Sequence, residues 1–160
     1  MSPRKAPEIA VIVEDEGWRK ARHARAALKR AALAAFAKAS AEPARPFTIL
    51  LTSDRKLRAL NAEFRGRDKP TNVLSFPAGE TGYLGDIAIA HGVTAREAAA
   101  EGKPFAHHAA HLAVHGVLHL LGFDHERARD AAVMEPLEIE ILKRLKIPNP
   151  YLSRFAKKAA

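Results

Sequence analysis

One stretch, residues 107–125, constrains this chain more than any other, because it holds six of the eight histidines. It reads HHAAHLAVHGVLHLLGFDH, and the residues before Gly122 are almost all helix formers with no proline among them. In a helix, His111, His115 and His119 would share one face, since about four residues make one turn. Leucines and valines cover much of the remaining surface, so the sequence predicts a buried helix that ends at Gly122.

The last three histidines of this stretch have metal-ligand spacing, H-x3-H-x2-G-x2-H from residue 115 to residue 125. Two imidazoles one turn apart, with a third returned by the glycine turn, would bring three nitrogens to one point, which is how a tetrahedral zinc site with one open position is built. Without a metal, each buried ring nitrogen would need another partner. Other H-x3-H pairs precede this one, but only the 115/119 pair is followed by a glycine and a third histidine. His111 is therefore expected either to contact a ligand without binding the metal or to lie in the core. We therefore predict one Zn²⁺ per chain, held by His115, His119 and His125.

The charge balance favours an anionic partner. The net charge is +8, and nucleic acid is the leading polyanion for such a surface, although a basic surface can also serve only to solvate the protein. The absence of cysteine excludes disulfides and thiolate metal sites and is typical of a reducing cytoplasm. No apolar run approaches the ~20 residues of a membrane span, so we expect no membrane partner. We expect one domain over residues 1–160.

Hydrophobic periodicity divides the chain into short strands and longer helices. Strands are predicted at 8–14, which should be buried, and at 47–52, 72–76 and 83–90. Helices are predicted at 17–39, 54–64, 94–100, 107–121 and 129–145. Ser53 should cap the second helix, which should turn Phe64 into the core. Thr94 and Glu97 should form a capping box for the third helix.

A second cluster of functional residue types lies in FRGRDKPTNVLSFP, residues 64–77. Arg65, Arg67 and Lys69 surround a glycine turn next to an expected strand. Such a turn is a plausible phosphate site, because arginine can bind two oxygens with its planar fork. Asp86 lies within the last expected strand. A charge there needs a reason, either a hydrogen bond at the strand end or a hydrogen bond to a histidine that binds the metal.

The two motifs together, FRGRDKPTNVLSFP and HGVLHLLGFDH, closely resemble the bacterial YbeY family of metal-dependent endoribonucleases, also called ribosomal RNA maturation factors. LGDI at 84–87 and the histidines at 107–111 support the resemblance, which spans nearly the whole chain. It implies a single α+β domain, a mixed sheet of about four strands packed with about five helices, with a zinc site at the end of a central helix. The zinc ligands that it implies are His115, His119 and His125.

The resemblance implies an enzyme that cleaves single-stranded RNA in the cytoplasm. It implies roles in 16S ribosomal RNA 3′-end maturation and ribosome quality control, with the small ribosomal subunit and its assembly factors as partners. It also implies an important arginine at Arg65, which would stabilise the charge that develops on the phosphoryl oxygens. Arg67 and Lys69 would bind flanking phosphates. Either water or the RNA 2′-hydroxyl could attack, and the acids that could act as base or support a ligand are Asp86, Asp124 and Glu126.

Two alternatives to a zinc nuclease stay open on the sequence. The histidine spacing also matches that of metzincin peptidases, but those carry a glutamate base directly after the first histidine, where this chain has Gly116. A ribosome-assembly protein that binds RNA without cutting it would instead have a structural zinc, closed by a fourth protein ligand. His111 or Asp124 could supply that ligand.

Overall fold

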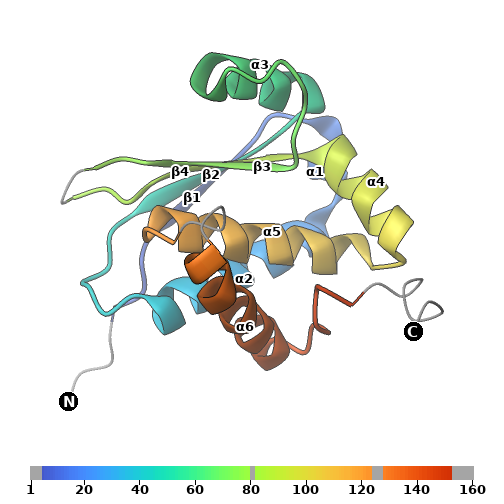
Figure 1. Cartoon of the computed structure of the whole chain (residues 1–160). Coiled ribbons are helices and arrows are strands. Elements are labelled where there is room, and N and C mark those ends of the chain that lie inside the picture. Colours follow the sequence, from blue (N-terminus) through green and yellow to red (C-terminus); the bar gives the residue numbers. More distant parts are fainter. Residues whose placement is uncertain (1–4, 80–81, 124–127, 153–160) are drawn as a thin grey trace.

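Four strands and six helices make up the part of the chain that the structure describes (Figure 1). This computed structural model describes residues 5–79, 82–123 and 128–152, without the side chains of 128–131. The strands are β1 (Ile9–Val13), β2 (Phe47–Thr52), β3 (Val73–Pro77) and β4 (Gly85–Ala90). The helices are α1 (Glu16–Lys20), α2 (Arg22–Ala39), α3 (Asp54–Arg65), α4 (His91–Glu101), α5 (Phe105–Leu120) and α6 (Ala128–Arg144). No helix in these described ranges is both long and apolar enough to cross a membrane.

The strands form one mixed sheet in the order β1-β2-β4-β3. β1, β2 and β4 are parallel, and β3 runs antiparallel to β4 along one edge. The predicted α+β class and four-stranded mixed sheet are therefore confirmed. The prediction of a buried first strand is wrong, because β1 has a neighbouring strand on one side only. Its Ala10 and Ile12 are exposed.

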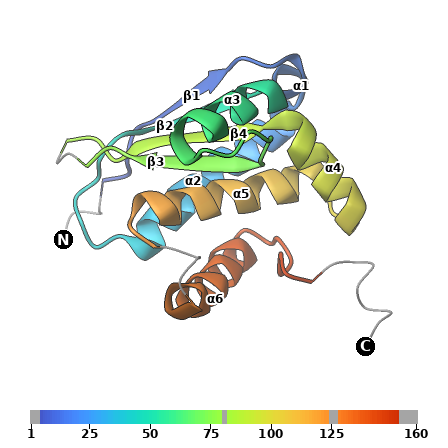
Figure 2. The ribbon, with the colours of Figure 1, turned by 45° about the horizontal axis from the view of Figure 1, so that its top comes forward.

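Helices cover both faces of the sheet (Figures 1 and 2). α2 and α5 pack together on one face, α3 lies on the other, and α6 packs against the outer side of α2 and α5. Ile87 and Ile89 of β4 belong to the main core under α5, whereas Ala88 and Ala90 belong to a smaller cluster under α3. α5 lies close to β4 at Gly116, where an added Cβ would be 2.8 Å from Ile87 Cγ2. The histidine helix is thus packed directly on the sheet.

The predicted helix 17–39 is divided at Ala21, which makes six described helices instead of the five expected. Ala21 has φ −91° and ψ 59°, outside the helical range. α1 places Trp18 fully inside the core, where its Nε1 donates to the carbonyl oxygen of Ile89 at 3.2 Å. The alanine-rich sequence carries no local signal for this break, since alanine favours an uninterrupted helix.

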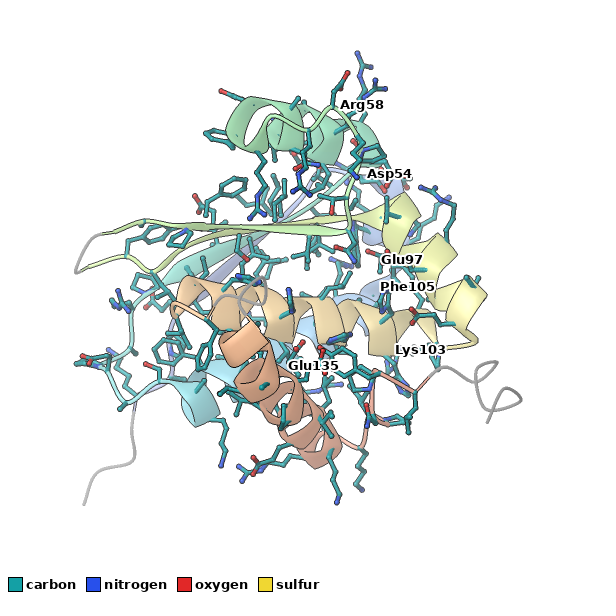
Figure 3. The ribbon with its side chains drawn as sticks, viewed as in Figure 1. Asp54, Arg58, Glu97, Lys103, Phe105 and Glu135 are labelled. Atoms are coloured by element: carbon teal, nitrogen blue, oxygen red, sulfur yellow. The ribbon has the colours of Figure 1, made fainter. Side chains whose placement is uncertain are left out.

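The predicted capping box of α4 is wrong, because the helix begins three residues earlier, at His91. Thr94 lies inside the helix, and its hydroxyl donates to a backbone carbonyl one turn earlier at 2.6 Å. A side chain of α3 acts at this end instead: Asp54 accepts the backbone N–H of Val93 at 2.9 Å (Figure 3). The negative charge of Asp54 also interacts favourably with the positive N-terminal end of the α4 dipole.

α3 begins as predicted but ends with an exposed ring. Ser53 accepts the backbone N–H of Lys56 at 3.2 Å, and Leu57 is fully buried. Phe64 is 60% exposed, so the prediction that it lies in the core is wrong. Its ring packs against Phe76 of β3 at the margin of the smaller cluster, because the cluster ends before the last turn of α3.

Candidate functional site

His111, His115 and His119 occupy successive turns of α5, a helix that is buried over much of its surface. His115 Nε2 and His119 Nε2 approach to 3.1 Å. Two imidazole nitrogens bound to one tetrahedral zinc lie about 3.3 Å apart, given Zn–N bonds of about 2.05 Å. The two side chains therefore fit a zinc ion as neighbouring ligands, and their role as ligands stays a prediction.

A buried carboxylate of α6 contacts two of these histidines, His111 and His115. Glu138 is 1% exposed, and its Oε2 lies 2.8 Å from His111 Nε2 and 3.3 Å from His115 Nδ1. When His115 donates its Nδ1–H to this carboxylate, its Nε2 lone pair points away from Glu138 and is available to a metal. Carboxylates commonly hold metal-ligand histidines in this way. His111 shares the carboxylate and lies one turn before the 115/119 pair.

The charge of Glu138 is maintained by its neighbours. Burial alone would raise the pKa of Glu138, but hydrogen bonds from His111 and His115, with the charge of these rings, outweigh burial and lower it to about 2. Tyr151, which follows α6, donates its hydroxyl to Glu138 Oε1 at 2.5 Å and packs its ring edge against His111. Burial and the adjacent carboxylate raise the pKa of Tyr151, so this hydroxyl remains a donor. Glu138 is therefore an ionised acceptor surrounded by three side chains.

The sequence interpretation missed Glu138 and Tyr151. Glu138 lies on the apolar stripe of α6, one turn after Met134 and three residues before Ile141. A charge within an apolar helical stripe indicates a buried polar contact, so this signal could have identified Glu138. No local pattern marks Tyr151, because its contact forms only when the chain returns to α5 after α6.

Arg65, Arg67 and Lys69 lie on or directly before one turn, residues 66–70, which we call the cation turn. Gly66 has φ 67°, in the left-handed region, and ends α3 immediately after Arg65. The backbone N–H groups of Gly66 and Arg67 donate to carbonyl oxygens in the last turns of α3, each at 3.2 Å. The three cations therefore project from a well-defined helix end.

Two side-chain contacts hold the cation turn against α3. Asn61 is buried, and its Nδ2 donates to the carbonyl oxygen of Lys69 at 2.9 Å. Arg58 pairs with Asp68 at 2.8 Å on the outer side (Figure 3), and this hydrogen bond and charge lower the pKa of Asp68. An exposed ion pair contributes little stability, so the buried amide is the main determinant of the path of the turn.

The cation turn and α5 contribute to the walls of one cavity of about 640 Å³. α3, β3, α4, α6 and Tyr151 also line it, and Glu97 of α4 and Glu135 of α6 are labelled in Figure 3. The candidate site residues that line the cavity are Arg65, Arg67, Lys69, His111, His115 and Glu138. The fold thus brings together two motifs whose functional residues, Arg65 and His115, are fifty positions apart in the chain.

The structure does not bring Asp86 to the histidines. Its neighbour Ile87 faces α5, and successive strand residues point to opposite faces, so Asp86 lies on the side of α3. There it is exposed and accepts the hydroxyl hydrogen of Tyr83 at 2.5 Å. Asp86 therefore does not support a ligand histidine in this fold, and a hydrogen bond near the strand end accounts for its charge.

The other predicted acids and the third predicted ligand lie outside the described residues; they are Asp124, His125 and Glu126. Within the described ranges, no group of three or more histidine, aspartate or glutamate side chains is arranged to hold a metal. The described part of the site thus contributes the 115/119 pair alone. His125 as third ligand, and zinc itself, stay predictions.

Gly116 removes the base that the peptidase alternative needs. A Cβ at this position would meet Ile87 Cγ2 at 2.8 Å and Ile87 Cδ1 at 3.1 Å. A glutamate here would push α5 away from β4, and overpacking of a core in this way is destabilising. Glycine at this position is therefore a packing requirement of this fold.

Comparisons with known proteins agree with the two motifs. The family model described as Endoribonuclease YbeY matches residues 12–146. The proteins named Endoribonuclease YbeY from Rhodopseudomonas palustris (strain ATCC BAA-98 / CGA009) and Bradyrhizobium diazoefficiens are 47% and 46% identical to this chain; the matches cover 94% and 96% of this chain and 84% and 90% of those proteins. The solution structure of TM1509 from Thermotoga maritima has a similar fold, with a TM-score of 0.54 and 23% identity over 86% of this chain and 91% of that one. Identity of this extent along both chains makes the protein a member of the YbeY endoribonuclease family.

Proposed function

We propose that this protein is a metal-dependent endoribonuclease that cleaves single-stranded RNA in the cavity between the cation turn and α5. The observation that carries the proposal is that three cations and two histidines, His111 and His115, line one cavity. Phosphodiester cleavage requires positive charge where the phosphoryl oxygens gain negative charge. It also requires activation of the attacking group, for which a metal site is well suited.

His115, His119 and His125 would hold the metal, which we propose to be one zinc ion per chain. Three neutral imidazoles would leave the double charge of a bound zinc uncompensated, and the site would then offer Lewis acidity toward a phosphoryl oxygen. Glu138 would orient His115 through its Nδ1–H, and Tyr151 would in turn orient Glu138. These two residues would act on the metal through His115.

The three cations would divide their work between chemistry and binding. Arg65 lines the cavity at the end of α3, and its planar guanidinium could bind two phosphoryl oxygens as their charge increases. Arg67 and Lys69 would bind the phosphates on either side, which positions the RNA. The end of α3 and the cation turn place all three cations on the wall of the cavity that α5 also lines.

The biological substrate that we propose is ribosomal RNA. The resemblance carried by both motifs implies 16S ribosomal RNA 3′-end maturation and ribosome quality control, with the small ribosomal subunit and its assembly factors as partners. A net charge of +8 supports a polyanionic partner of this kind. We propose a cytoplasmic location and one catalytic domain over residues 1–160.

Metal analysis joined to an RNA cleavage assay tests the proposal. The purified protein should contain about one zinc per chain and should cut a defined single-stranded RNA. A chelator should abolish cutting, and added zinc should restore it. A protein that binds zinc and RNA but does not cut would instead be the non-catalytic assembly factor.

Affinity for single-stranded RNA should fall steeply as salt rises. Each phosphate that the protein neutralises contributes about −0.7 to the slope of log affinity against log salt. Arg67→Ala should lower the slope by about one contact and weaken binding modestly, with the maximal cleavage rate nearly intact. Anisotropy of a labelled RNA at several salt concentrations measures the slope. Arg30→Ala, an exposed change on α2, is the control, and a flat salt dependence of the wild type would contradict the prediction.

Glu138→Gln should weaken zinc binding about 10- to 100-fold, the range typical of outer partners of ligand histidines. Glutamine keeps the size of the side chain and one oxygen acceptor but loses the charge. Excess zinc should restore most of the cleavage rate, because Glu138 acts through His115. Zinc titration of the apoprotein against a chromophoric chelator measures the affinity. Glu140→Gln, an exposed change on the same helix, is the control, and unchanged affinity in Glu138→Gln would contradict the positioning role.

A further inference from the structure

Phe64 and Phe76 form a small aromatic surface, which we call the aromatic platform. The side chain of Phe64 is 60% exposed, and its ring contacts that of Phe76 with centroids 5.2 Å apart and planes at 62°. Phe76 is partly buried against the cluster under α3. In the platform, the exposed ring of Phe64 is therefore held by the partly buried ring of Phe76.

Phe64 and Phe76 do not line the cavity, but each lies close in the chain to residues that do. Phe64 directly precedes Arg65, which lines the cavity at the end of α3. On β3, Val73 and Leu74 line the same cavity, and Phe76 follows two residues after Leu74. The exposed ring of Phe64 thus directly precedes a cation that is expected to bind an RNA phosphate, at the same end of α3.

Exposure of an apolar side chain alone carries no inference, because isolated exposed apolar residues are common. Ile12 and Val133 are exposed to similar extents, 49% and 52%. Neither Ile12 nor Val133 is aromatic, and neither has a cationic residue of the cavity wall next to it in the chain. Phe64 differs from them in its ring, its aromatic support and its cationic neighbour.

We propose that the aromatic platform stacks one base of the single-stranded RNA whose phosphates bind the cation turn. The inference rests on the proposed function and adds a binding site outside the cavity. Proteins bind single-stranded RNA with aromatic side chains placed among cations, because unpaired bases expose their faces. Every base has such a face, so the platform adds affinity without sequence choice. It also favours unpaired over duplex RNA, in which the bases already stack on one another.

Affinity measurements on ring-deleting and ring-keeping variants test the platform. Binding of a short labelled RNA is measured in the presence of a chelator, so that the RNA is not cut. Phe64→Ala and Phe64→Leu should raise Kd about tenfold, as expected for the loss of one stacked base. Phe64→Tyr should bind as the wild type does, and so should Ile12→Ala, which removes an equally exposed apolar side chain elsewhere. Thermal melting should show all four variants folded, with at most a small loss of stability where the ring contact with Phe76 or the strand residue Ile12 is removed.

A second measurement changes the RNA in place of the protein. An abasic nucleotide moved along the RNA should weaken wild-type binding about tenfold at one position. The Phe64→Leu protein should not respond to the abasic nucleotide at that position, since the two changes remove the same contact.

The outcomes separate this inference from the proposed nuclease function. Equal affinity of wild type and Phe64→Leu overturns the platform, even if both proteins cut RNA. If Phe64→Leu loses as much affinity for duplex RNA as for single-stranded RNA, the platform is also overturned. A wild-type dimer that Phe64→Ala dissociates would make the surface an interface between copies of the chain and would overturn it as well. A wild type that shows the abasic effect but never cuts RNA supports the platform and contradicts the nuclease.

Discussion

Replacing His115 or His119 with alanine should remove the metal and lower cleavage of single-stranded RNA by about a thousandfold or more, since a catalytic metal is worth several kcal/mol. The two Nε2 atoms lie 3.1 Å apart, so each ring is expected to supply one bond to the same ion. Without either ring, too few ligands are left to hold the metal. Elemental analysis after gel filtration measures zinc per chain, and a labelled RNA reports the cleavage rate of the same sample.

Two other histidines of α5 provide matched controls. His107→Ala should keep its zinc, because His107 lies about two turns before His115. His111→Ala should bind zinc more weakly without losing it, since His111 hydrogen-bonds to the carboxylate that it shares with the ligand His115. If His111→Ala loses zinc as completely as His115→Ala, the choice of the 115/119 pair is wrong. Thermal melting separates loss of metal from loss of the fold.

Arg65→Lys should lower the rate of RNA cleavage about a hundredfold or more, the range seen when a donor to a developing oxyanion is removed. Lysine keeps the charge but loses the planar fork that can hold two phosphoryl oxygens. Zinc content and folding should stay near normal, because Arg65 is exposed and lies at a helix end capped by Gly66. Single-turnover cleavage at saturating protein measures the chemical step without the binding contribution.

Arg67→Lys, the same change two residues away, is the control for Arg65→Lys. It should leave the single-turnover rate nearly intact, because Arg67 is expected to bind a flanking phosphate. If both substitutions act alike, the cations serve binding or scaffolding only. An Arg65→Lys protein that cuts at the wild-type rate would refute the catalytic role.

Local sequence was enough to predict the histidine helix and family membership. The hydrogen bonds of a helix connect residues four apart, so the H-x3-H spacing alone places His115 and His119 on one face. The glycine stop at Gly122 and the cap at Ser53 are equally local, and Ser53 caps α3 as predicted. Both family motifs are contiguous in the chain, which is why they could be recognised without a fold.

Contacts between distant segments decided the rest of the site. Glu138 meets His115 across 23 residues, and the direction of this contact depends on how α6 packs on α5. The cavity that joins Arg65 to the histidine helix has walls from α3 and α5, which lie on opposite faces of the sheet, and from the edge strand β3. No pattern within either segment specifies these relations, because they depend on packing.

The wrong prediction for Phe64 and the choice between the two roles considered for Asp86 have the same physical cause. Phe64 follows the apolar stripe of α3, but the cluster beneath the helix ends before it, so its ring is exposed. The alternation of side chains along β4 places Asp86 on the face away from the histidines. The sequence could not predict which face meets α5, because both faces of this strand are covered. The sequence by itself determined which residues share a helix face or a turn. Only the tertiary structure decided which of these faces meet, because burial is set by packing partners far away in the chain.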